Sequence, residues 1–315
     1  MAETPALRIG TRASPLALVQ AREVRDRLAA AHPELAADGA VEIVPLSTRG
    51  DRLTDGPLAD LGGKGLFTQE IEAGLAAGHL DLAVHSMKDM ATALPDGLAV
   101  PCILEREDPR DVLIAGAGVG GLDDLPAGAV VGTASLRRQA QLLYRRPDLR
   151  VVPLRGNVGT RLRKIEEGAA AATLLALAGL NRLGQAGDAT AALSVEDMLP
   201  AVGQGAIGIE CRADDARARA LLAPLDHPPS HRCVTAERAL LAALDGSCRT
   251  PIAAYATLGP GDEIHLRALV ARPDGGALYR AERRGAAADG ARLGADAGAE
   301  LRAADPALLA GFRVS

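Results

Sequence analysis

Hydrophobic and polar positions follow two patterns over the first two-thirds of the chain. Short apolar runs of strand length alternate with segments in which apolar residues recur at helical spacing. The runs that predict strands cover residues 6–9, 41–46, 81–85, 112–115, 129–133, 150–154 and 172–176. Ser14 followed by Pro15 is typical of an N-cap and a first helical position, so a helix is predicted to begin there. This alternation predicts an α/β architecture with mostly parallel sheets.

The last third has a different pattern. It predicts a helix over 233–244, a strand over 250–258, a hairpin formed by 264–272 and 277–283, and a final helix over 290–303. These elements suggest a small α+β domain, with residues 227–229 (His-Pro-Pro) as the linker before it. No internal repeat is evident. Residues 47–63 are polar and glycine-rich without periodicity, which is typical of a lid or binding loop.

Composition excludes several classes of protein. The 315 residues are 48% hydrophobic and 24% charged, which is neither collagen-like nor disordered. The longest apolar run, 168–180, is shorter than the ~18 residues that cross a bilayer, and the first ten residues lack the pattern of a secretory signal. We therefore expect a cytoplasmic protein with reduced cysteines. None of the four cysteines forms a CxxC pair, so no metal site is expected.

Charge is concentrated in one segment of an acidic chain. The net charge is −5, yet residues 135–165 hold nine basic residues and one acidic residue, a net +8 that leaves −13 for the rest. Such a patch indicates a local anionic ligand, although a solvated helix face is an equal alternative. Two GxGxxG stretches, at 116–121 and 203–208, lack the strand and helix context of a nucleotide site.

Basic residues also recur where a predicted strand meets a predicted helix. Cations in the first turn of a helix oppose the macrodipole unless an anion binds there. The residues at these junctions are Arg12, Ser14, Ser135, Arg137, Arg138, Arg155, Asn157, Thr160 and Arg161. Their pattern favours a small ligand with several carboxylates or phosphates.

Asp89 and Cys248 are the candidates for chemistry. Asp89 follows Lys88 at the end of a buried strand, where it is either a turn residue or a catalytic carboxylate. Cys248 lies in a predicted loop beside Arg249, which favours the thiolate. The alternative reading, a small buried hydrophobe, suits Cys102 and Cys211 better, because they lie in apolar strand-like surroundings, and Cys233 opens a predicted helix.

Taken together, these segments resemble the porphobilinogen deaminase (hydroxymethylbilane synthase) family from about Leu7 to Arg284. The resemblance is carried, in order, by TRASPLALVQA, STRGD, GGKGLF, HSMKD, EREDPRD, GTASLRRQ, LRGNVGTRL, LPAVGQGAIGIECR and the residues around Cys248. It implies a transferase of tetrapyrrole (haem) biosynthesis, which joins four porphobilinogen molecules head to tail into linear hydroxymethylbilane and releases ammonia. It also implies a dipyrromethane cofactor that primes the reaction, attached by a thioether to Cys248.

The resemblance assigns roles by position. It implies that Asp89 is the catalytic carboxylate, which stabilises the cationic azafulvene formed as ammonia leaves. Besides Cys248, the implied cofactor-binding residues are Ser14, Lys64, Lys88, Thr133, Ser135, Arg137, Arg138 and Arg155. The implied substrate-binding residues are Arg12, Arg161, Arg182 and Gln204.

The resemblance also implies three domains. Two are similar to type II periplasmic binding proteins: a discontinuous domain of residues 1–104 and 200–225, and a second of residues 105–199. A small α+β domain of residues 226–315 would carry the cofactor cysteine. We expect a monomer that binds neither membrane nor nucleic acid, because two phenylalanines and three tyrosines are too few for base stacking. The main alternative is an anion-binding receptor without chemistry, which would need no Cys248.

Overall fold

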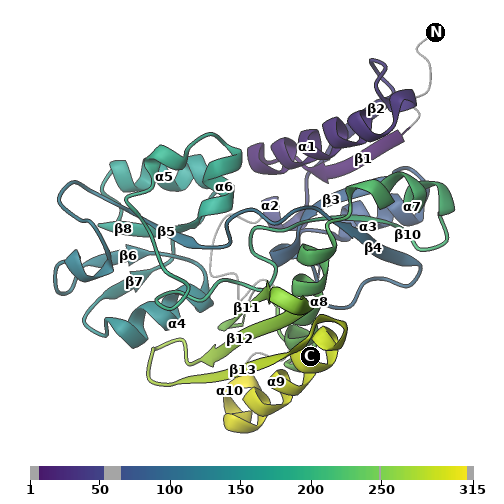
Figure 1. The fold of residues 1–315 in the computed structure, drawn as a ribbon. Coiled ribbons are helices and arrows are strands. Elements are labelled where there is room, and N and C mark those ends of the chain that lie inside the picture. The colour runs from purple at the N-terminus through teal and green to yellow at the C-terminus, as the bar shows by residue number, and fades with distance from the viewer. Residues whose placement is uncertain (1–6, 53–64, 248–249, 311–315) are drawn as a thin grey trace. The chain divides into compact units, whose positions relative to one another are not determined.

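The computed structural model describes residues 7–52, 65–247 and 250–310 (Figure 1). Contacts between residues divide the chain into two compact units. Of the described residues, the first comprises 7–52, 65–106 and 206–231, and the second comprises 107–205, 232–247 and 250–310. Among the described residues, the chain therefore passes between the units near residues 106, 205 and 231, and each unit contains segments that are distant in sequence.

A five-stranded sheet forms the centre of the first unit. Its order is β2 (Val41–Leu46), β1 (Leu7–Arg12), β3 (Leu82–Ser86), β10 (Ile207–Arg212) and β4 (Leu98–Ile103). β1 pairs in parallel with β2 and β3, whereas β10 is antiparallel to both of its neighbours. The sheet is therefore mostly parallel, with one reversed strand in its fourth place.

Helices bury both faces of this sheet. On one face, α1 (Pro15–Ala31) packs Val24 and Leu28 into the core that contains Leu82, together with α7 (Ala216–Leu222). On the other face, α3 (Gln69–Ala76) packs Ile71 and Leu75 against the sheet. A short helix, α2 (Arg49–Arg52), follows β2.

The second unit contains a sheet with the same plan. Its order is β7 (Arg150–Val152), β6 (Val130–Gly132), β8 (Ala172–Ala176), β5 (Asp111–Ala115) and β9 (Ala191–Ala192). β6 is parallel to β7 and β8, and β5 is antiparallel to β8 and β9. This sheet is accompanied by α4 (Leu136–Arg145), α5 (Val158–Glu166) and α6 (Leu177–Arg182). The two sheets confirm the expected α/β class, and they form a structural repeat where no sequence repeat is evident.

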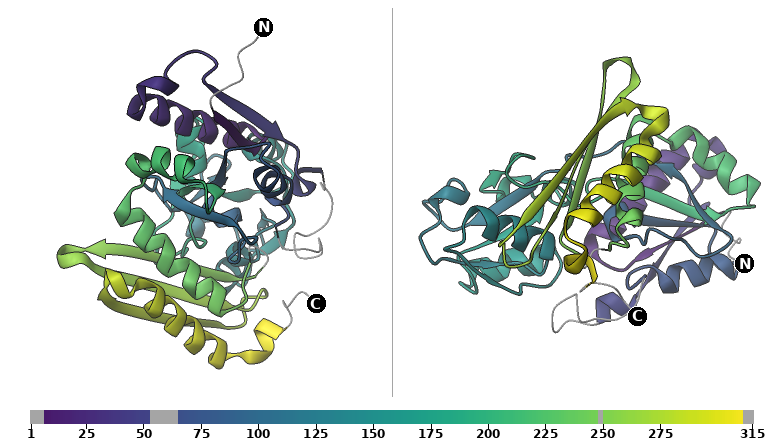
Figure 2. Two further views of the ribbon diagram at one scale, coloured as in Figure 1. Left: turned by 90° about the vertical axis from the view of Figure 1, so that its right-hand side faces the viewer. Right: turned by 90° about the horizontal axis from the view of Figure 1, so that it is seen from below.

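A three-stranded antiparallel sheet completes the second unit. It consists of β11 (Ile252–Gly259), β12 (Glu263–Ala271) and β13 (Leu278–Ala286). The helices α8 (Pro228–Ala243) and α9 (Gly290–Ala304) share one core with this sheet (Figure 2). α10 (Pro306–Ala310) follows α9. Sheet and helices confirm the expected small α+β domain.

Short 3-10 helices connect these elements. They are η1 (Pro33–Leu35), η3 (Met87–Asp89), η4 (Leu122–Asp124), η5 (Ala186–Asp188), η6 (Ala223–Leu225), η7 (Pro260–Asp262) and η8 (Ala287–Asp289). Within the described ranges, no helix is long and apolar enough to cross a membrane.

Several local expectations were wrong. Residues 227–229 are not a linker, because α8 begins at Pro228. Proline is favoured at the first position of a helix, where a backbone N–H would have no acceptor within the helix. Cys233 consequently lies inside α8 instead of opening a helix. The expected loop of residues 47–63 contains α2, and its residues 53–63 lie outside the described residues. β4 and β9 were not predicted.

Candidate active site

Asp89 lies at the end of a buried strand in the first unit. β3 leads directly into η3, whose central feature is the buried side chain of Met87. Met87 N donates a hydrogen bond to Ala206 O (3.0 Å), and its side chain fills the space above Gly208. A Cβ atom at position 208 would lie 2.1 Å from Met87 Sδ. Met87 therefore anchors the turn, and Lys88 and Asp89 follow it as half-buried residues.

Arg12 ends β1, the parallel neighbour of β3, so it reaches the same edge of the sheet. Its Nη1 lies 3.6 Å from Asp89 Oδ2, and its guanidinium stacks on Phe67 with 4.3 Å from Cζ to the ring centroid. Both charged side chains keep about a quarter of their surface exposed (24% and 29%), so the pair contributes little to stability. The structure thus brings together two residues that were predicted separately.

Two other features complete this edge of the first unit. Ser14 is the N-cap of α1, and its Oγ accepts a hydrogen bond from Ala17 N (3.3 Å). Sequence reasoning had not assigned Phe67 to the site. The available signal was its position directly after the GGKGL segment as one of two phenylalanines in the chain.

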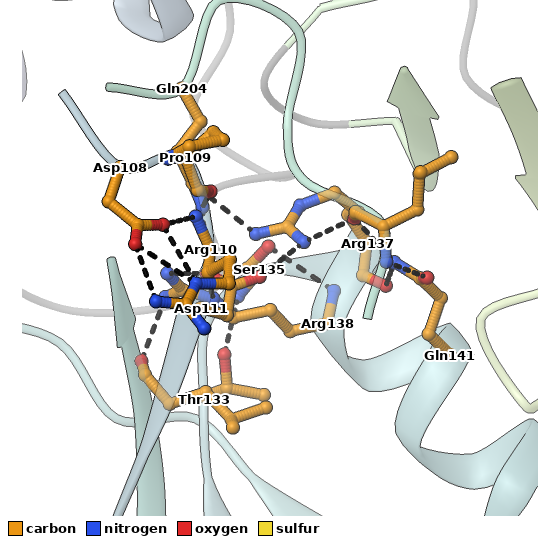
Figure 3. Close-up of polar contacts among 12 residues, drawn as sticks. Asp108, Pro109, Arg110, Asp111, Thr133, Ser135, Arg137, Arg138, Gln141 and Gln204 are labelled. Atoms are coloured by element: carbon orange, nitrogen blue, oxygen red, sulfur yellow. Dashed lines mark hydrogen bonds and ion pairs between the residues drawn. The ribbon is translucent and has the colours of Figure 1, made fainter. Parts of the chain in front are cut away.

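Asp111 organises the predicted ligands of the second unit (Figure 3). Its Oδ2 accepts from Arg137 Nη1 (2.6 Å), and its Oδ1 accepts from Arg138 Nη2 (2.7 Å). The Asp111 side chain is fully buried, and the two arginine side chains are 5% and 6% exposed. Burial alone would raise the pKa of Asp111, but the two guanidinium charges outweigh burial and hold that pKa well below its usual range.

Gln204 joins the same network. Its Nε2 donates to Asp111 Oδ1 (3.0 Å) and to Pro109 O (2.7 Å). At the start of α4, Ser135 Oγ accepts from Arg138 N (3.4 Å), and Thr133 Oγ1 accepts from Ser135 N (3.2 Å). One carboxylate thus stands between two guanidinium groups, which leaves the cluster with a net charge of +1. Such a cluster attracts an anion.

Arg155 lies in the turn that precedes α5, and Arg161 lies in the first turns of that helix. Asn157 is the N-cap of this helix and accepts from Thr160 N (2.9 Å). Arg161 Nε donates to Gly156 O (2.7 Å), and Lys164 Nζ donates to Arg155 O (3.2 Å). The φ of Gly156 is +127°, a conformation that strongly favours glycine. Both arginine side chains are half-buried.

Arg182 ends α6 and contacts the segment where the chain leaves the second unit. Its Nη2 donates to Gly205 O (3.0 Å), which also accepts from Glu107 N (3.3 Å). Gly205 has φ +87°, and a Cβ atom there would lie 2.4 Å from Glu107 O. Position 205 therefore requires glycine for two independent reasons.

The basic segment of residues 135–165 serves two purposes. Arg137 and Arg138 are buried in the Asp111 network. By contrast, Arg145 pairs with Asp123 (2.8 Å) and Asp197, and Arg146 pairs with Asp148 (2.8 Å), as partly exposed ion pairs. Arg145 and Arg146 thus agree with the reading as a solvated helix face, whereas the reading as a ligand site stays a prediction.

The predicted site residues fall into separate groups. The first unit holds Arg12, Ser14, Lys88 and Asp89, and the second holds Thr133, Ser135, Arg137, Arg138, Arg155, Arg161, Arg182 and Gln204. Lys64 and Cys248 lie outside the described residues. Hydroxyl and guanidinium donors dominate these groups, a donor set that fits the acetate and propionate groups of a dipyrromethane. Across the described ranges, no cluster of three His, Cys, Asp or Glu residues could hold a metal ion.

Comparison with known proteins identifies the family. A family model described as "Porphobilinogen deaminase, dipyromethane cofactor binding domain" matches residues 7–220, and one described as "Porphobilinogen deaminase, C-terminal domain" matches residues 231–303. The chain is 57% identical over 301 residues to the porphobilinogen deaminase of Paracoccus denitrificans, covering 96% of this chain and 95% of that protein. It is 58% identical over 294 residues to the enzyme of Nitrobacter winogradskyi, with coverages of 93% and 92%.

A plant protein shows similar identity. The chloroplastic porphobilinogen deaminase of rice is 55% identical over 304 residues, covering 96% of this chain and 85% of that protein. Among solved structures, the sulphonate-binding protein SsuA of Escherichia coli is 16% identical, with a TM-score of 0.41 over 76% of this chain and 70% of that one. Two family models together span most of the chain, and the relatives share more than half of its residues. The chain therefore belongs to the porphobilinogen deaminase family, whose members bind a dipyrromethane cofactor and make hydroxymethylbilane.

Proposed function

We propose that this chain performs the family's reaction with Asp89 as its catalytic carboxylate and Cys248 as the attachment point of dipyrromethane. Each condensation forms one carbon–carbon bond between the free α-carbon of the terminal pyrrole and the aminomethyl carbon of porphobilinogen. The carbon–nitrogen bond breaks, ammonia leaves, and the α-carbon loses its proton. Dipyrromethane, when bound, supplies the first pyrrole α-carbon of this sequence.

The pairing of Arg12 with Asp89 is the observation that carries the assignment of Asp89. Positive charge develops on porphobilinogen as ammonia departs, and a carboxylate fixed beside that charge lowers the barrier. Arg12 holds Asp89 at the edge of the sheet at 3.6 Å, and Met87 anchors the turn behind it. The half-buried position of Asp89 leaves it accessible to substrate.

The accessibility of the thiols supports Cys248. Cys102, Cys211 and Cys233 are all buried, at 0%, 0% and 6% exposure. Burial raises the pKa of Cys102 to about 12 and that of Cys211 to about 11, so neither forms a thiolate readily near neutral pH. Cys248 is the remaining cysteine of the four.

Carboxylate recognition is assigned to the polar residues at the strand ends. Ser14, Lys64, Lys88, Thr133, Ser135, Arg137, Arg138 and Arg155 would hold the acetate and propionate groups of the cofactor. Arg12, Arg161, Arg182 and Gln204 would hold those of the incoming substrate. The net positive charge around Asp111 supports this assignment for the second unit.

The coarser organisation is part of the same proposal. We assign three domains, residues 1–104 with 200–225, 105–199, and 226–315, each containing one of the three sheets. We also propose that the protein acts as a cytoplasmic monomer on porphobilinogen, without a membrane or nucleic-acid partner.

The variant Asp89→Asn tests the proposal. It keeps the side-chain volume but removes the charge, so we expect ammonia release to slow by about 10²–10³-fold, with an unchanged melting temperature. Asp26→Asn is the matched control, because Asp26 is an exposed acid of α1 that pairs with neighbouring Arg25. An Asp89→Asn protein that turns over within threefold of its parent would remove Asp89 from the mechanism.

A further inference from the structure

Three titratable side chains are buried between the first sheet and α3, and the mechanism above uses none of them. His85 Nε2 lies 3.0 Å from Glu210 Oε2, and the two side chains are 4% and 0% exposed. Glu72 of α3 is 8% exposed and interacts electrostatically with both. Thr68 O, at the start of α3, accepts a backbone hydrogen bond from Glu72 N (2.8 Å). We call His85, Glu210 and Glu72 the buried triad.

Strand register explains why His85 and Glu210 meet. His85 of β3 lies opposite Gly208 of β10, and Ala83 lies opposite Glu210. His85 and Glu210 are therefore diagonal neighbours on one face of the sheet, a spacing that long side chains bridge. A slip of one residue between β3 and β10 would turn one of the two side chains to the opposite face.

Stability does not explain the triad. The surrounding layer is apolar, with Ile71, Leu75 and Ala83 in one buried cluster. Burial raises the pKa of Glu72, and the charge of Glu210 adds to that effect. Glu210 Oε1 is buried without a hydrogen-bond partner among the described residues. Apolar side chains of similar volume usually serve as well as, or better than, a buried ion pair.

The same register also places Asp89. Met87, two residues after His85, donates its N–H to Ala206 O, directly before β10. Its side chain occupies the space that the missing Cβ of Gly208 leaves open. Any shift of β10 along β3 would move the space at Gly208 away from the Met87 side chain. The η3 turn, which contains Asp89, would then change its position.

We propose that His85 and Glu210 are positioning residues, which fix the register of β3 against β10 and thereby hold Asp89 in place. The inference rests on the proposed catalytic role of Asp89. Apolar replacements could fill the space equally well, but they would not select this register. His85 and Glu210 would thus lower the stability of the fold slightly while they fix the position of the η3 turn.

The double variant His85→Leu/Glu210→Leu separates positioning from stability. Because both partners are removed, we expect a melting temperature at or above that of the parent. We expect kcat to fall at least tenfold, with KM within twofold and the mass of the cofactor adduct retained. A double variant with the parent's kcat would overturn the proposal.

If the double variant does not fold, single variants of His85 test whether the pair positions Asp89. His85→Gln keeps an N–H donor for Glu210, so we expect a kcat within threefold of the parent, measured well below the melting temperature. His85→Leu lacks the donor and should lose at least tenfold. Equal rates for these two variants would contradict the positioning role. His231→Leu is the control, because His231 bonds a carboxylate of the same unit, Asp226, away from β3 (2.8 Å).

Combination with Asp89→Asn separates this inference from the proposed function. If the buried pair acts through Asp89, its removal should cost no further rate in the Asp89→Asn background, since coupled sites are not additive. Multiplied losses would show that His85 and Glu210 act elsewhere, while the role of Asp89 stands. An active Asp89→Asn protein would instead refute the proposed function itself.

Discussion

Asp111 is the single residue on which the polar network of the second unit depends. Its two carboxylate oxygens accept hydrogen bonds from Arg137, Arg138 and Gln204, all three of them predicted ligands. Because Asp111 is wholly buried, it acts on a ligand only through these side chains. Arg137 and Arg138, which we propose to bind the carboxylates of the ligand, are thus themselves held in place by the carboxylate of Asp111.

Asp111→Asn should destabilise the second unit by about 3–5 kcal/mol, because two buried guanidinium groups lose their counter-charge. Urea unfolding followed by circular dichroism measures this loss. Asp123→Asn is the matched control: Asp123 pairs with Arg145 but is 71% exposed, so its loss should cost less than about 1 kcal/mol. Equal costs for the two variants would contradict the account of Asp111.

Glu72 gives a pH dependence of stability with a definite sign. Burial raises its pKa in the folded protein, so the folded state holds the proton to higher pH than the unfolded state does. Stability therefore falls as pH rises from the ordinary glutamate pKa through the raised one. Glu72→Gln removes this fall, and it should unfold at higher urea concentration than the parent at about pH 8 but not at about pH 4. If the two proteins differed by the same urea concentration at both pH values, the raised pKa of Glu72 would be contradicted. Glu34→Gln, at an exposed position, serves as control.

Sequence reasoning found candidate residues but not their partners. Arg12, Asp89, Arg137 and Arg138 stand out because charge follows a buried strand or opens a helix. The contact of Asp111 with Arg137 joins residues 26 apart, and that of His85 with Glu210 joins residues 125 apart. Local patterns carry no information on such distances, so Asp111, His85 and Glu210 were not singled out.

At the scale of elements, the junction of β3, η3 and β10 controls the placement of the proposed catalytic residue. β3 and β10 are antiparallel strands from separate segments of the first unit, and Met87 links them through Ala206 and Gly208. Gly208 is therefore required by packing, and not by its backbone conformation.

Gly208→Ala tests this packing. The new methyl group would lie 2.1 Å from Met87 Sδ, so the Met87 side chain must move and the η3 turn with it. We expect kcat to fall at least tenfold while the cofactor adduct stays in place. Gly78→Ala is not a suitable control because Gly78 has φ +71°, whereas Gly187→Ala meets nothing within 4 Å and should retain full activity. A fully active Gly208→Ala protein would show that Met87 does not fix the turn.

Apolar runs predicted most strands of the first two sheets. The predicted strands at 41–46 and 172–176 agree with β2 and β8. β4 was not predicted, although its pairing with β10 spans no more of the sequence than the pairing of β3, which was. β1 continues to Arg12, beyond its apolar run, because β2 pairs along its whole length.

At the scale of the whole molecule, the described chain passes three times between the compact units, and two of these passages lie beside the reversed strands of the five-stranded sheets. Each sheet has its reversed strand, β10 or β5, next to one of these passages. Periodicity predicted the α/β class but no such exchange of segments, which follows from non-local pairing. The family resemblance supplied it instead.

Attachment of the cofactor through one thioether requires one reactive thiol. Burial protects Cys102, Cys211 and Cys233, which leaves Cys248 as the attachment point in our account. We propose that this chain carries a covalent dipyrromethane on Cys248 and extends it with porphobilinogen.

An intact mass spectrum of the purified protein, followed by peptide mapping, tests this claim most directly. We predict a mass excess of two linked pyrrole units on the peptide that contains Cys248, and no excess in a Cys248→Ser variant. An adduct on the peptide of Cys102, Cys211 or Cys233 would contradict the assignment of the thiol. A bare polypeptide mass that stays bare after incubation with porphobilinogen would contradict the account as a whole.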